Sequence, residues 1–221
     1  MGSHPDTDPL NLLQQGAATL GLDLPALILE QFRLYLTELK LWNARLNLTG
    51  LKTDRDIVVK HFLDSLAVTP FLGPAASLAD LGSGAGFPGV VLKLLQPELA
   101  LTLIEARQKK AAFLEYLMSA LKLPKVEVLQ VHLTPGLARK WGPRFAAVVC
   151  RAAFSLERFF ELAAPLLLPG GLALALKGPH LPKPELEKAG NLALGLTPLK
   201  LHPYNLPITG EARVLVAARR R

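Results

Sequence analysis

A glycine-rich stretch with an acid on either side is the part of this sequence best suited to bind a ligand. In "DLGSGAGFPG" four glycines fall between Gly82 and Gly89, and Asp80 comes directly ahead of them. A second acid, Glu105, ends the apolar run "LTLIE". Glycines let the backbone approach a ligand closely, and carboxylates favour positive charge and hydroxyl groups. The stretch therefore predicts a site for a nucleotide-like cofactor.

Two cofactors fit this pattern to different degrees. Residues Gly84 to Gly89 form G-x-G-x-x-G, the dinucleotide fingerprint, and Glu105 follows at the distance typical of a ribose-binding acid. Asp80 argues against NAD, because it would face a pyrophosphate that a helix N-terminus attracts. S-adenosylmethionine carries an ammonium and a sulfonium, so a carboxylate at a strand end favours it. We expect S-adenosylmethionine, with an NAD-binding Rossmann oxidoreductase as the alternative.

The elements that must position this loop follow from the periodicity of apolar residues. Apolar spacings of three and four predict a helix from Leu24 to Trp42, capped by Asp23, and capping residues open a second helix over Asp54–Thr69. The predicted strands are Ser77–Leu81, Ala100–Glu105, Val126–Gln130, Ala146–Arg151, Leu172–Lys177, a segment near Leu199–Tyr204, and the tail "EARVLVAARRR". The helices predicted between them are Pro88–Leu95, Lys109–Leu121, Pro135–Trp141, Leu156–Leu167 and Pro184–Ala193.

This alternation predicts an α/β fold with a doubly wound, mostly parallel sheet that ends in an antiparallel pair. We expect two parts, an N-terminal helical cap over residues 1–70 and the sheet domain over residues 71–221. The only cysteine, Cys150, lies in an apolar run and is expected to be a buried thiol in a reducing compartment. No continuous apolar span and no signal peptide are evident, so we expect a cytoplasmic protein without a membrane partner.

The charge balance indicates an anionic partner. Lysine and arginine number 25 against 18 aspartates and glutamates, a formal net charge of +7. Nucleic acid is the partner that this excess favours, although a basic enzyme of small molecules remains open. No spacing of histidines suggests a metal site.

Five segments together resemble one known family. They are "WNARLNLTG" (42–50), "KHFLDSL" (60–66), "DLGSGAGFPG" (80–89), "CRAAFSLERF" (150–159) and "LALKG" (174–178). In this order they resemble the bacterial 16S rRNA guanine-N7 methyltransferases known as RsmG or GidB. The resemblance implies a seven-stranded class I methyltransferase fold, S-adenosylmethionine as the methyl donor, and N7 of a guanine in the 530 loop of 16S rRNA as the acceptor.

The resemblance also assigns residues. It implies active-site roles for Arg151, Lys177 and Lys109. Its cofactor-binding residues are Asp80, Gly82, Ser83, Gly84, Gly86, Phe87, Glu105, Ala106, Arg107, Leu133, Thr134 and Arg151. Where the family has a small residue followed by an acid, this chain has Leu133 and Thr134, so a hydroxyl or the backbone must take over adenine recognition. We expect a monomeric enzyme that acts on 16S rRNA, the 30S subunit or an assembly intermediate. A non-catalytic ribosome-binding protein is the other alternative.

The chemistry limits which residues take part. N7 of guanine has a free lone pair and no proton to remove, so its methylation needs no general base. His61, although it stands beside Lys60 and near Asp64 in "KHFLDS", is therefore expected to be structural or to contact RNA. Arg45, Asn47 and Lys60 would give the cap a polar, basic rim suited to RNA. We expect Arg151 or Lys177 to hold O6 of the guanine or a phosphate.

Overall fold

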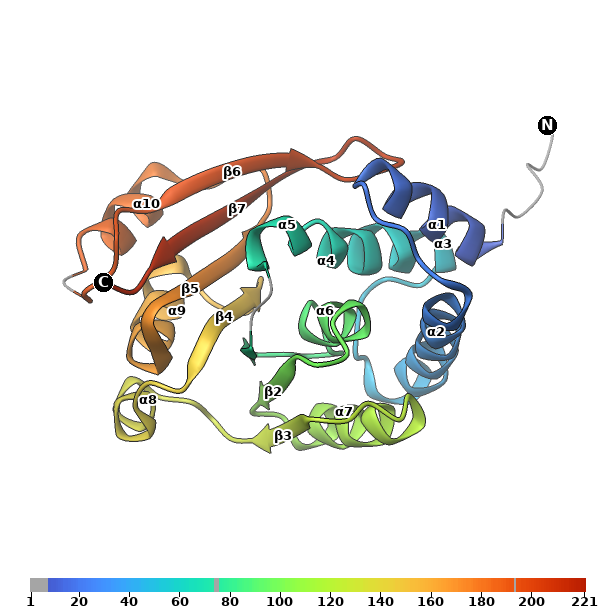
Figure 1. Ribbon diagram of the computed structural model, residues 1–221, viewed down its shortest axis with the longest axis horizontal. Helices are drawn as coiled ribbons and strands as arrows, with labels where there is room; N and C mark the ends of the chain where they lie inside the picture. The colour runs from blue at the N-terminus through green and yellow to red at the C-terminus, as the bar shows by residue number, and fades with distance from the viewer. Residues whose placement is uncertain (1–7, 74–75, 193) are drawn as a thin grey trace.

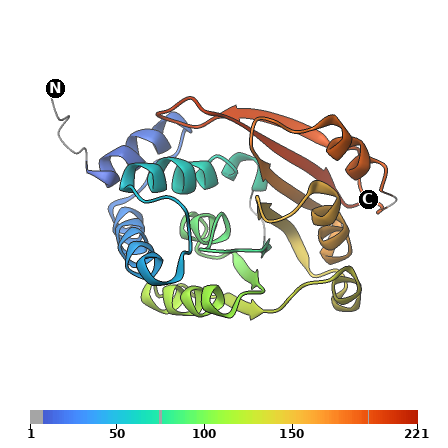
Figure 2. The ribbon, with the colours of Figure 1, turned by 180° about the vertical axis from the view of Figure 1, so that it is seen from behind.

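The structure, a computed structural model, describes residues 8–73, 76–192 and 194–221. A twisted sheet runs through the molecule with helices on both faces (Figure 1). Viewed from behind, the helices of residues 54–72 again lie beside the C-terminal strand pair, to which the Tyr204–Asp64 hydrogen bond joins them (Figure 2). Among the helices of the described residues, none is long and apolar enough to cross a membrane.

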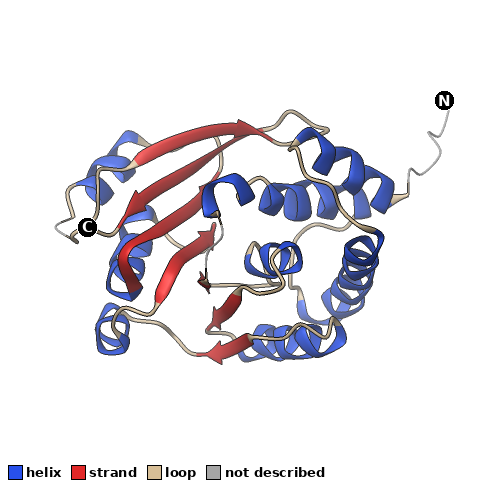
Figure 3. Ribbon diagram, viewed as in Figure 1, coloured by secondary structure: helices blue, strands red, loops and turns tan. Residues whose placement is uncertain are grey.

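The sheet has seven strands in the order β3-β2-β1-β4-β5-β7-β6, and only β7 runs antiparallel to its neighbours (Figure 3). The strands are β1 (Ser77–Leu81), β2 (Ala100–Glu105), β3 (Val126–Gln130), β4 (Phe145–Arg151), β5 (Leu167–Lys177), β6 (Lys200–Asn205) and β7 (Ala212–Arg219). This confirms the predicted doubly wound sheet and its antiparallel end. β5 begins at Leu167 rather than Leu172, because Gly170 and Gly171 exchange backbone hydrogen bonds with Arg220 and so extend the sheet past the predicted start.

Helices connect the parallel strands in the expected places. They are α6 (Gly89–Leu95), α7 (Gln108–Ala120), α8 (Pro135–Trp141), α9 (Leu156–Ala163), the 3-10 turn η2 (Ala164–Leu166) and α10 (Lys183–Gly190). Ser155 caps α9 and Thr134 caps α8, each accepting a backbone hydrogen bond three residues on. The predicted last helix ended at Ala193, which lies outside the described residues.

The N-terminal region is helical, as predicted, but its details differ. It contains α1 (Pro9–Thr19), α2 (Ala26–Leu46), α3 (Asp54–Ile57), the π-helix η1 (Val58–Leu63), α4 (Asp64–Leu66) and α5 (Thr69–Leu72). No separate helix was predicted over α1. Asp23 does not cap α2, because the helix starts after Pro25, which makes no side-chain cap bond.

Alternation along the strands divides the core into two layers. Leu78, Val149, Leu174 and Leu215 face the cap together with α6 and α7, and we call this layer the cap-side core. The residues that follow them in the chain face α8, α9 and α10. The cap-side core is continuous from Leu10 in α1 to the sheet, so the cap and the sheet share one hydrophobic interior. The boundary at residue 70 stays a prediction.

Candidate active site

A cavity of about 460 Å³ opens at the carboxyl ends of β1, β2 and β4, the edge where open α/β sheets bind ligands. Its walls come from the glycine loop, the ends of β2 and β3, and the cap. We call it the first cavity, and its lining residues are Leu48, Thr49, His61, Leu81, Gly82, Ser83, Gly84, Ala85, Phe87, Ile104, Glu105, Ala106, Arg107, Lys110, Val131, His132, Leu133, Arg151, Ala152, Ala153 and Phe154.

The glycine loop has a shape that side chains would not allow. Gly82 has a φ of 68°, and a Cβ placed there would lie 2.7 Å from the Cβ of Ala153. Gly86 has a φ of 99°, and its Cβ would lie 2.6 Å from the hydroxyl of Tyr35. The same hydroxyl donates to the carbonyl of Ala85 at 2.6 Å. Glycine is thus required at both positions, and α2 of the cap holds the loop from behind.

Glu105 stabilises the loop and still faces the first cavity. Its Oε2 accepts from the backbone N–H of Gly84 at 2.9 Å, and its Oε1 accepts from that of Arg107 at 2.8 Å. Each carboxylate oxygen can accept a further hydrogen bond. The side chain is therefore oriented by protein donors on the strand end and can accept from two hydroxyl groups of a ribose.

Asp80 lies beneath the loop rather than in the cavity wall. Its side chain is fully buried, and Oδ2 accepts from the backbone N–H of Gly89 at 2.8 Å, at the start of α6. Its Oδ1 is also buried and, within the described residues, has no hydrogen-bond partner. Burial raises the pKa of Asp80 to about 7, although the bond from Gly89 and the nearby Arg151 oppose this rise. The buried carboxylate gives this end of the cavity a negative field without direct exposure.

A second cavity of about 420 Å³ adjoins the first at the carboxyl ends of β4 and β5. Four residues line both cavities: Thr49, His61, Arg151 and Ala152. Ala152 has a φ of 52°, the left-handed region that non-glycine residues rarely adopt. The chain therefore turns sharply straight after Arg151, and the arginine side chain lies at the wall that the two cavities share.

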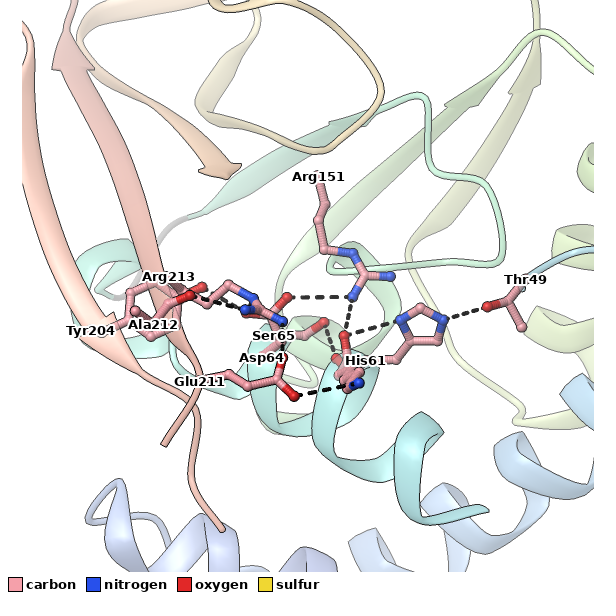
Figure 4. Close-up of polar contacts among 10 residues, drawn as sticks. Thr49, His61, Asp64, Ser65, Arg151, Tyr204, Glu211, Ala212 and Arg213 are labelled. Carbon is pink, nitrogen blue, oxygen red and sulfur yellow. Dashed lines mark hydrogen bonds and ion pairs between the residues drawn. The ribbon is translucent and has the colours of Figure 1, made fainter. Parts of the chain in front are cut away.

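Arg151 reaches from the sheet to the cap (Figure 4). Its Nη1 donates to the carbonyl of Lys60 at 2.9 Å and lies 3.6 Å from Oδ2 of Asp64. The guanidinium carbon lies 4.9 Å from the centre of the Phe87 ring, a cation–π contact. Phe87, predicted as a wall of the cofactor site, lines the first cavity. Its ring also packs against the Arg151 guanidinium.

His61 is held as a neutral ring between the two cavities. Its Nδ1 lies 3.1 Å from the carbonyl of Lys60, which can only accept, so this nitrogen carries the proton. Its Nε2 lies 2.7 Å from Oγ1 of Thr49 and accepts from that hydroxyl (Figure 4). Burial, with the Arg151 cation nearby, lowers the pKa of His61 to about 3. Both ring nitrogens are occupied, which fits the expected structural role.

Lys177 differs from Arg151 in where it points. Arg151 pairs with Leu176 in the β4–β5 register, so the side chains of Arg151 and Lys177 leave the sheet on opposite faces. The Lys177 ammonium donates to the carbonyl of Phe154 at 2.7 Å and to Glu185 at 3.0 Å. It lines the second cavity, and its bonds fix the segment that carries Ala153 and Phe154.

Some residues assigned by the resemblance lie outside the first cavity, and others that line it were missed. Lys109 is exposed, and its neighbour Lys110 lines the cavity instead. Gly86 and Thr134 lie behind the cavity wall and do not line the cavity. The hydroxyl of Thr134 accepts from the backbone N–H of Leu137, so it serves the helix. Lys110 and the cap residue Thr49 were missed because each lies outside the motif positions that were carried over. Within the described residues, no group of His, Cys, Asp and Glu side chains could hold a metal ion.

The residues present fit S-adenosylmethionine. Beneath the glycine loop, Oδ1 of Asp80 has no hydrogen-bond partner within the described residues, so its charge can favour a cationic ligand. Glu105 can accept hydrogen bonds from ribose hydroxyls. Val131 and Leu133 offer an apolar wall to an adenine.

The fold is shared with solved methyltransferases. An O-methyltransferase from Bacillus cereus solved in complex with SAH aligns with a TM-score of 0.61 and 14% identity over 94% of this chain and 97% of that one. A predicted O-methyltransferase from Agrobacterium tumefaciens aligns with a TM-score of 0.56 and 22% identity over 72% of this chain and 78% of that one. Fold and site together define a class I S-adenosylmethionine-dependent methyltransferase.

The family follows from sequence comparison. The model of the GidB family, described as rRNA small subunit methyltransferase G, matches residues 28–200. Proteins named ribosomal RNA small subunit methyltransferase G are 42% identical in Deinococcus deserti, over 93% of this chain and 85% of that one, and 38% identical in Geobacter sp. (strain M21), over 93% and 94%. This chain belongs to the rRNA small subunit methyltransferase G family. Neither the oxidoreductase nor the non-catalytic alternative receives support from these comparisons.

Proposed function

We propose that this protein transfers a methyl group from S-adenosylmethionine to N7 of a guanine in the 530 loop of 16S rRNA. Family membership supports the RNA substrate. The observation that carries the site assignment is Arg151 in the shared wall of the two cavities. The first cavity then takes the cofactor, and the second takes the guanine.

In this arrangement the chain's own residues bind and orient the reactants. S-adenosylmethionine, when bound, supplies an electrophilic methyl group on a positively charged sulfur. Glu105 accepts from the ribose, and the glycine loop accommodates the methionine end. Arg151 donates to O6 of the guanine and leaves the N7 lone pair free to attack, because a cation bonded to N7 itself would block the reaction.

Catalysis in this scheme is positioning. The bond from the methyl carbon to sulfur breaks as the bond to N7 forms, and the positive charge passes to the base. No proton leaves N7, so no general base is needed. His61 supports this scheme, because its ring is neutral and hydrogen-bonded at both nitrogens. Alignment of nucleophile, methyl and leaving group in a site shielded from water supplies the rate.

We further propose a monomer that acts in the cytoplasm on 16S rRNA within the 30S subunit or an assembly intermediate. In-line displacement on N7 needs no metal ion. The net charge of +7 favours an RNA partner.

The test is transfer of labelled methyl to purified 30S subunits and to naked 16S rRNA, both lacking the modification, followed by mapping of the modified atom. The expected product is a single N7-methylguanine in the 530 loop. Arg151→Ala should abolish most transfer, and Arg151→Lys should restore little, because an ammonium cannot replace a planar fork of donors. Label on another atom or another RNA would contradict the proposal.

A further inference from the structure

Asp64 is a buried carboxylate that connects the cap with the central strand β4 and with the β7–β6 edge of the sheet. It belongs to α4 and its side chain is 7% exposed. The hydroxyl of Tyr204, in β6, donates to its Oδ1 at 2.7 Å, and Nε of Arg213, in β7, lies 4.0 Å from the same oxygen. Its Oδ2 lies 3.6 Å from Nη1 of Arg151, in β4 (Figure 4). Three strands thus bring polar groups to one carboxylate.

A carboxylate in such a place is costly unless its partners compensate. Burial raises the pKa of Asp64, while Arg151, the hydroxyl of Tyr204 and Arg213 lower it. An apolar side chain in its place would leave the cations of Arg151 and Arg213 without this counter-charge. The carboxylate therefore acts on its cationic partners and does not merely fill the interior.

The contacts of Arg151 show what that charge orients. Its anchors, the Lys60 carbonyl and Asp64, both meet the same nitrogen, Nη1, and the Phe87 ring lies against the guanidinium. Within the described residues, Nε and Nη2 donate no hydrogen bond. The guanidinium is therefore fixed at one corner while its remaining donors stay available in the wall between the cavities.

We propose that Asp64 is a positioning residue for methyl transfer, and that Tyr204 positions Asp64 in turn. The carboxylate orients the Arg151 guanidinium, and the tyrosine hydroxyl fixes the carboxylate through Oδ1. Neither residue touches the transferred methyl group in this scheme. The inference rests on the proposed function, in which Arg151 orients the guanine.

The first test is single-turnover methylation at saturating cofactor and RNA. Asp64→Asn keeps the shape without the charge, and Tyr204→Phe removes one hydroxyl. Each should lower the rate by about tenfold or more, because a small misplacement of an orienting group has a large effect on rate. Affinity for cofactor and RNA should stay within about twofold, since Arg151 remains present. Asp23→Asn and Tyr116→Phe, at an exposed aspartate and an exposed tyrosine, are the matched controls and should leave the rate unchanged.

A double-mutant cycle separates positioning from a general loss of structure. Asp64→Asn should have no further effect on the rate when Arg151 is already alanine, because its effect acts through the arginine. An equal fall in both backgrounds would overturn the proposal, and so would full rates in both single variants. If Asp64→Asn fails to fold, Tyr204→Phe with the same cycle gives the answer.

A second readout does not depend on activity. In the protein with ¹⁵N-labelled arginine, slow rotation should give Arg151 separate guanidinium signals, assigned by their loss in Arg151→Lys. Tyr204→Phe and Asp64→Asn should merge them, and Tyr116→Phe should not. If the wild type methylates no RNA yet these signals behave as expected, the proposed function fails while the positioning stands. Unchanged signals in both variants would overturn the positioning itself.

Discussion

His61 stacks against Phe87, with 4.5 Å between the ring centroids and 27° between the ring planes. The histidine comes from the π-helix of the cap and the phenylalanine from the glycine loop of the sheet, so this pair joins the two parts at the site. π-Helical turns are often found at functional sites, and this one carries both His61 and the Lys60 carbonyl that anchors Arg151.

The first prediction concerns the pH dependence of the chemical step. Because burial lowers the pKa of His61 to about 3, the ring stays neutral above that pH and gives no acid limb near its ordinary pKa of about 6.5. His61→Gln should keep measurable turnover and the same profile shape, as should the exposed control His180→Ala. The measurement is the single-turnover rate at saturating cofactor between about pH 5.5 and 9. A wild-type rate that falls below pH 6.5, and a variant without turnover, would restore His61 as an acid–base residue.

The second prediction concerns cofactor affinity and Asp80. Since burial raises the pKa of Asp80 to about 7, the carboxyl is largely protonated in the free protein at lower pH. A cationic ligand prefers the ionised form, so affinity for S-adenosylmethionine should rise between about pH 5.5 and 7 with release of a proton. Asp80→Asn should bind more weakly and remove this dependence. Calorimetry in two buffers of different ionisation enthalpy measures both effects, and a flat wild-type affinity would exclude a role for Asp80 in the charge of the site.

The third prediction concerns Glu105. Replacing it by glutamine should weaken S-adenosylmethionine binding by about 1.5–3 kcal/mol, because hydrogen bonds to a charged acceptor are lost. The loop should loosen as well, since Gly84 and Arg107 lose a charged acceptor for their N–H groups. Glu98→Gln, at an exposed glutamate paired with Lys125, is the control and should bind normally. Equal dissociation constants in both variants would remove Glu105 from the cofactor site.

The fourth prediction distinguishes two adjacent lysines. Lys110 lines the first cavity, whereas Lys109 is exposed outside its wall. Lys110→Ala should therefore lower affinity for cofactor or RNA by about 1 kcal/mol, while Lys109→Ala should change little beyond a modest salt-dependent loss of RNA affinity. Titrations of both ligands at two salt concentrations test this. The reverse order of effects would support the active-site role that the resemblance gives to Lys109.

The sequence predicted the sheet well because strand signals are local. Apolar runs bounded by glycine, proline and polar residues placed β1, β2 and β3 at their observed bounds. The helix α1 was not predicted separately, although Asp8 caps it and Pro9 is its first residue. The buried apolar residues of α1 pack against the π-helix, a contact that the sequence alone does not show.

The site was less predictable, because its geometry depends on long-range contacts. The motifs gave the glycine loop, Glu105 and Arg151, which line the first cavity. They did not show that Asp80 lies under the loop or that Arg151 and Lys177 leave the sheet on opposite faces. Tyr204 stands 140 positions from its partner Asp64, and no local pattern relates them.

The strand order has a consequence for how the enzyme matures. β6 precedes β7 in the chain, yet β7 lies between β5 and β6 in the sheet. During synthesis β6 therefore has no edge to join until β7 has emerged and paired with β5. The hydroxyl of Tyr204 reaches Asp64 only after that insertion, so in the positioning proposed above a nascent chain that already contains the whole glycine loop still lacks one of the groups that orient Arg151. Full-rate methyl transfer would then wait until β7 and β6 have taken their places in the sheet.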